Sequence, residues 1–173
     1  MPAPASLRVL LVATGLGVLL SGGAQAQQRP SRLGDHGAWT AATHVEGGQK
    51  VCYAFARATR SDPAGRSDVR LTVTHRPGQR DSVVLSAGYP YPRGAEVKLS
   101  VGATELAFYT NGSHAAARDS AAAIRAFRGG REVVARGPGA GGRGTATDSF
   151  SLSGFGAAHD AIGRECPAPG PRR

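Results

Sequence analysis

The chain has 173 residues, a sequence pI of about 10.7 and a formal net charge of +9 at neutral pH. This length fits one domain that can bury a sizeable core. The longest apolar run, Val9 to Leu20, is shorter than the roughly 20 residues of a spanning helix, so no membrane-spanning segment is predicted in the mature chain.

Residues 1–26 are predicted to be a secretory signal peptide. A short basic leader precedes the apolar run, and the small-residue triplet Ala24-Gln25-Ala26 follows it, which is the order typical of a cleavable signal. We expect cleavage after Ala26 and a single exported domain over residues 27–173. The alternative, an uncleaved anchoring helix, lacks a charged face and a longer apolar stretch. No cysteine follows the run directly, so a lipid anchor is not expected.

The positive charge is spread along the chain. Loss of Arg8 with the leader leaves a net charge of +8, carried mostly by arginine. Such a balance favours contact with anionic lipid, polysaccharide or nucleic acid. Because the arginines are not clustered, we expect diffuse, salt-sensitive attraction to anionic polymers. The basic ends, residues 27–32 and 167–173, are expected to be solvated tails.

The only two cysteines, Cys52 and Cys166, lie near opposite ends of the mature chain. In an oxidising compartment an even pair is expected to form a disulfide, which here would close almost the whole domain. The alternative, two free thiols or half of a metal site, is disfavoured because neither cysteine has a Cys-x-x-Cys partner or a histidine at ligand spacing.

Strand patterns dominate from about residue 37 to residue 110. Alternating apolar and polar residues, with Gly, Pro and Asp clusters between them, predict a series of short strands. The expected strands are 38–40, 50–57, 68–75, 82–86, 96–101, 104–110, 131–136 and 145–152.

Two helices are expected in the second half. Residues 114–127 are alanine-rich and are followed by Gly129-Gly130, which predicts a helix with a glycine stop. Residues 154–164 place apolar side chains at helical spacing and lead directly to Cys166. The predicted fold is therefore mainly β: an antiparallel β-sandwich or partly open barrel with two short helices, closed by one disulfide. A two-layer sheet with both helices on one face is the alternative.

No catalytic motif is recognised. Gly-x-Ser-x-Gly and metal-binding histidine motifs are absent, and the five histidines are scattered over presumed loops, strand ends and an exposed helix face. His159 and Asp160 are expected on a solvated helix face. We therefore predict no enzyme, no cofactor and no metal. A hydrolase that pairs Asp148 with His159 remains as an alternative hypothesis.

Three loops could be read as binding elements. The glycine-rich segment 137–144 lacks the Gly-Lys-Ser/Thr of a phosphate loop and leads into a strand, so we expect a mobile hairpin loop. Asn111-Gly112 is expected to be a turn, although Asn111-Gly112-Ser113 also matches a glycosylation acceptor. The segment 89–93 is expected to be a rigid turn, with a proline-and-aromatic recognition surface as the alternative.

The order of several short motifs resembles the invasion-associated locus B family of Gram-negative bacteria. They include Val51-Cys52-Tyr53, Val73-Thr-His-Arg-Pro77 and Val97-Lys-Leu-Ser-Val-Gly102, and the longest is Arg143-Gly-Thr-Ala-Thr-Asp-Ser-Phe-Ser-Leu-Ser-Gly-Phe155. The resemblance implies export to the periplasm or outer envelope and, in pathogenic members, a part in host-cell invasion. It implies no catalytic residues. One departure is His114-Ala-Ala-Ala117, where family members usually carry an aromatic residue.

The leading functional hypothesis is a non-enzymatic envelope protein that binds a partner. The expected partners are an envelope or host-surface protein or an anionic surface polymer, and no specific nucleic acid is expected. The alternatives are a periplasmic hydrolase of envelope polymer and a small basic carrier of anionic ligands. A carrier would need a closed apolar cavity.

Overall fold

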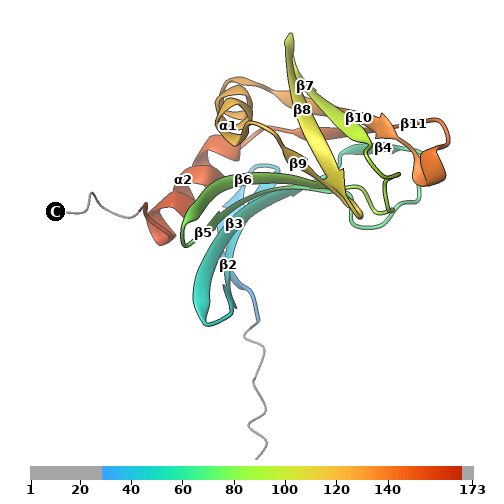
Figure 1. Ribbon diagram of the computed structural model, residues 1–173. Coiled ribbons are helices and arrows are strands. Elements are labelled where there is room, and N and C mark those ends of the chain that lie inside the picture. The colour runs from blue at the N-terminus through green and yellow to red at the C-terminus, as the bar shows by residue number, and fades with distance from the viewer. Residues whose placement is uncertain (1–28, 169–173) are drawn as a thin grey trace, which may run out of the picture.

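The computed structural model describes residues 29–168 (Figure 1). The predicted signal peptide lies outside this range, and no helix within the range is long and apolar enough to span a bilayer. The elements in chain order are β1 (Ser31–His36), β2 (Trp39–Glu46), β3 (Gln49–Arg57), β4 (Arg60–Asp62), β5 (Arg70–Arg76), β6 (Gln79–Ser86), β7 (Glu96–Val101), β8 (Thr104–Asn111), β9 (His114–Ala117), α1 (Ser120–Gly129), β10 (Glu132–Pro138), a 3-10 turn (Ala140–Gly142), β11 (Thr145–Ser151) and α2 (Phe155–Glu165).

The strands form one antiparallel sheet in the order β1-β2-β3-β5-β6-β9-β8-β7-β10-β11-β4. β2, β3, β5 and β6 form a curved half, and β7, β8, β10 and β11 cross over it (Figure 1). Only Ala58 and Thr59 separate β3 from β4, yet β3 pairs with β5 and β4 pairs with β11. The sheet therefore folds over itself without closing, which confirms the predicted open, mainly β fold with two helices.

A single large core fills the space between the two halves of the sheet. Its largest fully buried side chains are aromatic: Trp39, Phe108, Phe127, Phe150 and Phe155. The indole Nε1 of Trp39 donates to the backbone oxygen of Ser151 at 2.9 Å, so the one polar atom of this ring is satisfied inside the core. The rings of Trp39 and Phe155 meet edge to face at 4.9 Å, which joins β2 to α2.

The disulfide between Cys52 and Cys166 is present, with 6.0 Å between the two Cα atoms. It joins the middle of β3 to the residue that follows α2. The helix packs on β1, β2 and β3 through Phe155, Ala158 and Ile162, the three residues that helical spacing places on one face. The expected second helix, 154–164, is thus confirmed almost residue for residue.

Two predictions about the ends of elements are wrong. The expected helix over 114–127 begins only at Ser120, because residues 114–117 form β9 between β6 and β8. Pairing on both sides of this short strand overrides the helix propensity of alanine. Asp119 then caps α1 by accepting from the backbone N–H of Ala122. The expected N-terminal tail is also shorter than predicted, because Ser31 and Arg32 belong to β1.

Candidate functional site

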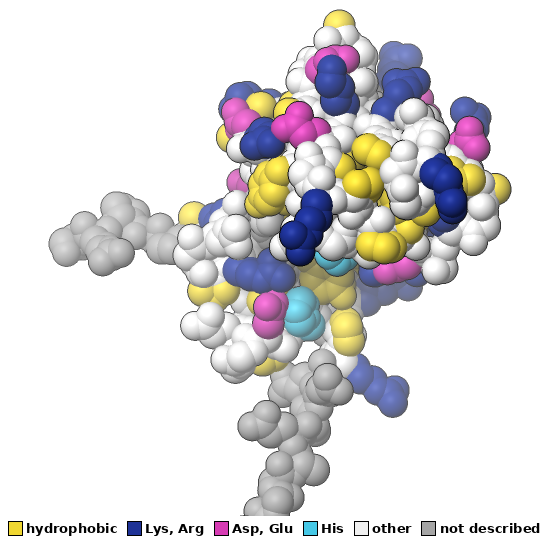
Figure 2. Space-filling model, turned by 45° about the vertical axis from the view of Figure 1, so that its right-hand side comes forward, with side chains coloured by type: hydrophobic (Ala, Val, Ile, Leu, Met, Phe, Trp, Pro, Cys, Tyr) yellow, Lys and Arg dark blue, Asp and Glu magenta, His cyan; other side chains and the backbone are white. Residues whose placement is uncertain are grey.

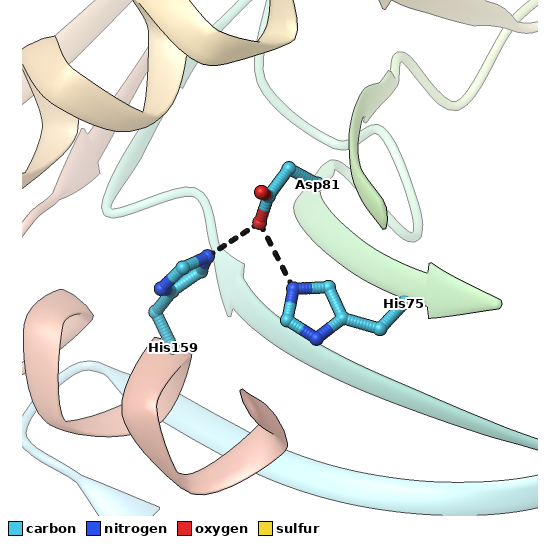
Figure 3. Close-up of side chains that lie close together, drawn as sticks. All are labelled: His75, Asp81 and His159. Carbon is cyan, nitrogen blue, oxygen red and sulfur yellow. Dashed lines mark hydrogen bonds and ion pairs between the residues drawn. The ribbon is translucent and has the colours of Figure 1, made fainter. Parts of the chain in front are cut away.

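The most notable polar cluster joins His75 of β5, Asp81 of β6 and His159 of α2 (Figure 3). One carboxylate oxygen of Asp81 lies 2.9 Å from Nε2 of His75 and 2.6 Å from Nε2 of His159. The side chain of His75 is 1% exposed, that of His159 13% and that of Asp81 36%. The cluster therefore connects the helix to the β5–β6 hairpin at the edge of the core.

The hairpin places His75 and Asp81 next to each other. Pro77 and Gly78 form its two-residue turn, with Gly78 at a φ of 77°. The pairing of the strands shifts between Thr74 and Arg76, and Asp81 has a φ of 56°, a left-handed conformation that aspartate tolerates better than most residues. This irregular turn directs both side chains to the same side, where α2 packs.

The other ring nitrogens define the proton positions. Arg128 of α1 contacts Nδ1 of His159 at 2.7 Å, and because a guanidinium only donates, this nitrogen must accept. The proton of a neutral His159 is therefore on Nε2, where it is donated to Asp81. Nδ1 of His75 is buried and has no hydrogen-bond partner in the described part of the chain. His75 likewise donates from Nε2. We call this arrangement of His75, Asp81 and His159 the clamp, because two N–H groups donate to one carboxylate.

The environment shifts the pKa values of two members of the cluster, His75 and Asp81. Burial lowers the pKa of His75 below its ordinary value, and this effect outweighs the hydrogen bond to Asp81; the charge of Arg80 also lowers it. Burial acts to raise the pKa of Asp81, but the hydrogen bonds from His159 and His75 outweigh it and hold the pKa below its usual range. Near neutral pH the cluster therefore contains a neutral His75 and an ionised Asp81.

Two imidazoles and a carboxylate are also a common set of metal ligands, so we tested their fit to a metal ion. A histidine that binds a metal through Nε2 carries its proton on Nδ1 and donates it to an acceptor. At His159 that proton would face the guanidinium of Arg128, and at His75 it would have no acceptor. The surroundings therefore suit the hydrogen-bonded clamp better than a metal site.

The proposed pairing of Asp148 with His159 is wrong. Asp148 of β11 forms a bidentate ion pair with Arg66. The side chain of Asp148 is 5% exposed and that of Arg66 is 9% exposed. Arg66 also donates to the backbone oxygen of Ala87 at 2.9 Å. His159 instead contacts Asp81, so the expectation of a fully solvated helix face holds only for its neighbour Asp160, which pairs with Arg128. Asp148 is thus a structural carboxylate.

The loop over residues 89–93 packs on this ion pair. The ring of Tyr89 lies 5.4 Å from the Arg66 guanidinium, and its hydroxyl donates to the backbone oxygen of Pro138 at 2.8 Å. Tyr89 is buried, and burial raises the pKa of both Tyr89 and Tyr91. This geometry matches the rigid turn that the sequence predicts.

A groove crosses the face of β2, β3 and β5 that points away from the core. Side chains alternate along β3, so Cys52 and Ala54 enter the core while Tyr53 and Phe55 face the groove. We call this feature the outer groove; it is open to solvent and has a volume of about 630 Å³. Its lining combines aromatic rings, threonine hydroxyls and arginines: His44, Tyr53, Phe55, Thr72, Thr74, Arg29, Arg70 and Arg76.

Sequence reasoning missed both the clamp and the groove, although some signals were present. His75 and Asp81 flank a Pro-Gly turn, which places them close together in any hairpin. His159 lies four residues after Phe155 and three before Ile162, so it borders the buried face of α2. Tyr53 and Phe55 share one face of an alternating strand with Arg57. Nothing local indicated that α2 would pack beside the hairpin, since that contact joins residues 78 positions apart.

The comparisons with known proteins agree with the architecture. Residues 39–163 match the family described as invasion associated locus B (IalB) protein. The crystal structure of invasion associated protein B from Bartonella henselae is similar in fold, with a TM-score of 0.55 and 19% identity over 75% of this chain and 92% of that chain. No curated protein matches the chain. Because the family match spans most of the sequence, the chain belongs to the invasion associated locus B family.

Proposed function

We propose that this chain is exported to the periplasm or outer envelope and acts there by binding a partner rather than by catalysis. The outer groove carries this proposal. It is an open, solvent-facing surface with aromatic and cationic side chains, the types that most often anchor recognition. By family membership, the partner would be an envelope component or a host-surface component.

The buried polar clusters and the two cysteines are engaged in structural contacts. Asp148 is bound by Arg66, both histidines of the clamp donate to Asp81, and the two cysteines form the disulfide. In the part of the chain that the structure describes, no serine or threonine hydroxyl is hydrogen-bonded to His75 or His159, as an activated nucleophile would be. Neither family nor relative is described by an enzymatic activity.

The groove also distinguishes this proposal from a carrier of small anionic ligands. A carrier needs a closed apolar cavity, whereas the outer groove is open and has charged residues along it. A binding protein for a polymer or for another protein needs an accessible surface, and the outer groove is open to solvent.

The proposal is tested by expressing the full chain in a Gram-negative host, separating the cell compartments and sequencing the N-terminus. We expect periplasmic or outer-envelope protein that begins at Gln27. The mature protein should show no hydrolysis of peptidoglycan or of model esters. Cytoplasmic protein that retains Met1 would overturn the export, and hydrolysis that disappears in Asp81→Asn would overturn the non-catalytic role.

A further inference from the structure

We propose that the outer groove binds an anionic polysaccharide with widely spaced charges, in which acidic sugars alternate with neutral ones. This inference rests on the proposed binding function and names its partner class. Three features carry it: a platform of aromatic rings, two threonines beside that platform, and a small number of arginines.

The aromatic platform lies on β2 and β3. The rings of Tyr53 and Phe55 are nearly parallel, with 6.1 Å between their centroids and 25° between their planes. The ring of His44 meets Tyr53 edge to face at 5.3 Å. These contacts hold the rings in place before a ligand arrives, which reduces the entropy lost on binding. Such rings offer apolar faces to the C–H faces of sugar rings.

Polar groups border the platform on the next strand. Tyr53 lies opposite Thr74 and Phe55 opposite Thr72 in the pairing of β3 with β5. A threonine hydroxyl donates one hydrogen bond and accepts others. Sugars present hydroxyls that both donate and accept, so a row of threonines beside aromatic rings matches a polysaccharide in both apolar and polar character.

The charges are cationic but few. Arg29, Arg70 and Arg76 reach the groove, and none of the described residues that line it is acidic. The guanidinium of Arg70 lies 5.7 Å from the centroid of the Phe55 ring. The guanidinium covers this face of Phe55, so a carboxylate held by Arg70 would place the attached sugar ring next to the aromatic platform rather than on Phe55. Arginine binds carboxylates through two parallel hydrogen bonds, which fixes the orientation of the ligand.

Exposed carboxylates next to the groove determine which spacing of charges along the ligand is favourable. Glu46 lies 3.1 Å from Nε of Arg76, and Asp68 lies 2.6 Å from Nη2 of Arg70. These exposed ion pairs are weak, so a ligand carboxylate can compete for the arginines. The same two acids repel a polymer with a charge on every unit. Charge complementarity thus favours sparse carboxylates over nucleic acid or a densely sulfated chain.

Figure 2 shows how the charged side chains are distributed on one face of the molecule. On the face in view, Lys and Arg side chains are separated from one another, and several have Asp or Glu beside them. No broad basic field gathers there that could attract a polyanion regardless of its shape.

The test uses hyaluronan oligosaccharides, in which a carboxylated sugar alternates with a neutral one, and mature protein over residues 27–173. Binding is measured by isothermal titration calorimetry, with heparin oligosaccharides and single-stranded DNA as competing classes. We expect hyaluronan to bind more tightly than either. Its affinity should fall only about threefold between low and physiological salt, because one or two ion pairs are involved.

The chain offers a matched control for the variants. Tyr109 on β8 is 48% exposed and has the Arg118 guanidinium 5.9 Å from its ring, so it is a similar aromatic–arginine pair outside the groove. Tyr53→Thr and Arg70→Gln should each weaken hyaluronan binding by about tenfold or more. Tyr109→Thr and Arg118→Gln should leave it within about twofold. Circular dichroism shows whether each variant is folded.

The outcomes separate this inference from the proposed function. If no hyaluronan binding is found, if the groove variants bind like the controls, or if DNA binds more tightly, the polysaccharide assignment is wrong. Export and the lack of hydrolysis would be unaffected by those results. Conversely, hydrolysis or cytoplasmic location would contradict the proposed function whatever the groove binds. If Tyr53→Thr does not fold, Arg70→Gln, which changes a partly exposed side chain, decides the question.

Discussion

Two buried polar clusters hold this domain together, and they differ in chemistry. The Arg66–Asp148 pair joins the loops after β4 and β6 to β11, and both of its members are charged. The His75–Asp81–His159 clamp joins α2 to the β5–β6 hairpin, and the pKa values of His75 and Asp81 are both lowered there. One end of the domain is therefore held by a buried ion pair, whereas the other contains a histidine with a lowered pKa and is also cross-linked by the disulfide.

The largest effect is expected at the permanent ion pair. Asp148→Ala leaves the Arg66 guanidinium buried without its counter-charge, and we expect a loss of about 3 to 5 kcal/mol in the free energy of unfolding. Urea unfolding followed by circular dichroism measures this loss. Asp160→Ala, which removes an exposed partner of Arg128, should cost less than about 1 kcal/mol. Equal losses in the two variants would show that the buried pair contributes no more to the free energy of unfolding than the exposed pair does.

The second effect concerns the disulfide that supports the clamp end. Cys52→Ser and Cys166→Ser should each lower stability by about 2 to 4 kcal/mol, because either change removes the same cross-link over 114 positions of sequence. Both variants should unfold at a lower urea concentration than the parent protein, and Cys52→Ser at the lower of the two, because it also places a hydroxyl in the core. Thiols that react with a maleimide in protein isolated without reductant would contradict the bond.

The third effect is a dependence on pH that belongs to the clamp. The pKa of His75 is lower in the folded protein than in the unfolded chain, so the unfolded state takes up the proton first as the pH falls. Stability should therefore decrease from about pH 6.5 downward, the ordinary pKa of histidine. The lowered pKa of Asp81 adds a separate loss below about pH 4.

This dependence is measured by urea unfolding at several pH values between 7 and 4. His75→Gln should flatten the decrease between pH 6.5 and 5, whereas His114→Gln, which changes an exposed histidine on β9, should not. An unchanged curve in the His75 variant would assign the pH dependence to other groups.

The smallest effect among the clamp residues is expected for His159→Gln. Glutamine can still donate one hydrogen bond to Asp81, so we expect a loss of only about 1 kcal/mol, largely from the changed contact with Arg128. Asp81→Asn should cost more than His159→Gln, because it removes the carboxylate that both histidines share; asparagine tolerates the left-handed backbone there. The reverse order would argue against a shared acceptor.

The sequence predicts much of the frame of this fold. Strict alternation in residues such as Val69 to Val73 identifies strands, and the spacing of Phe155, Ala158 and Ile162 identifies α2. Two cysteines can form only one internal disulfide. The residue spacing is a local feature and the number of cysteines is a simple count, so both can be recognised without knowledge of the packing.

What the sequence does not reveal is set by tertiary contacts. His114-Ala-Ala-Ala117 has the composition of a helix start. It forms a strand instead, because it pairs with β6 on one side and with β8 on the other. Arg66 is one of many arginines, and nothing near it indicates that Asp148 is its partner 82 positions away. The clamp and the groove depend in the same way on which strands become neighbours.

The central claim is that the clamp is a structural contact with both imidazole protons on Nε2, rather than a catalytic or metal-binding centre. Long-range ¹H–¹⁵N NMR of the histidine side chains at neutral pH tests it directly, recorded before and after one equivalent of Zn²⁺. We expect Nε2–H tautomers for His75 and His159 and no change on adding zinc. Conversion of both rings to the Nδ1–H tautomer with zinc would show a metal site and contradict the account.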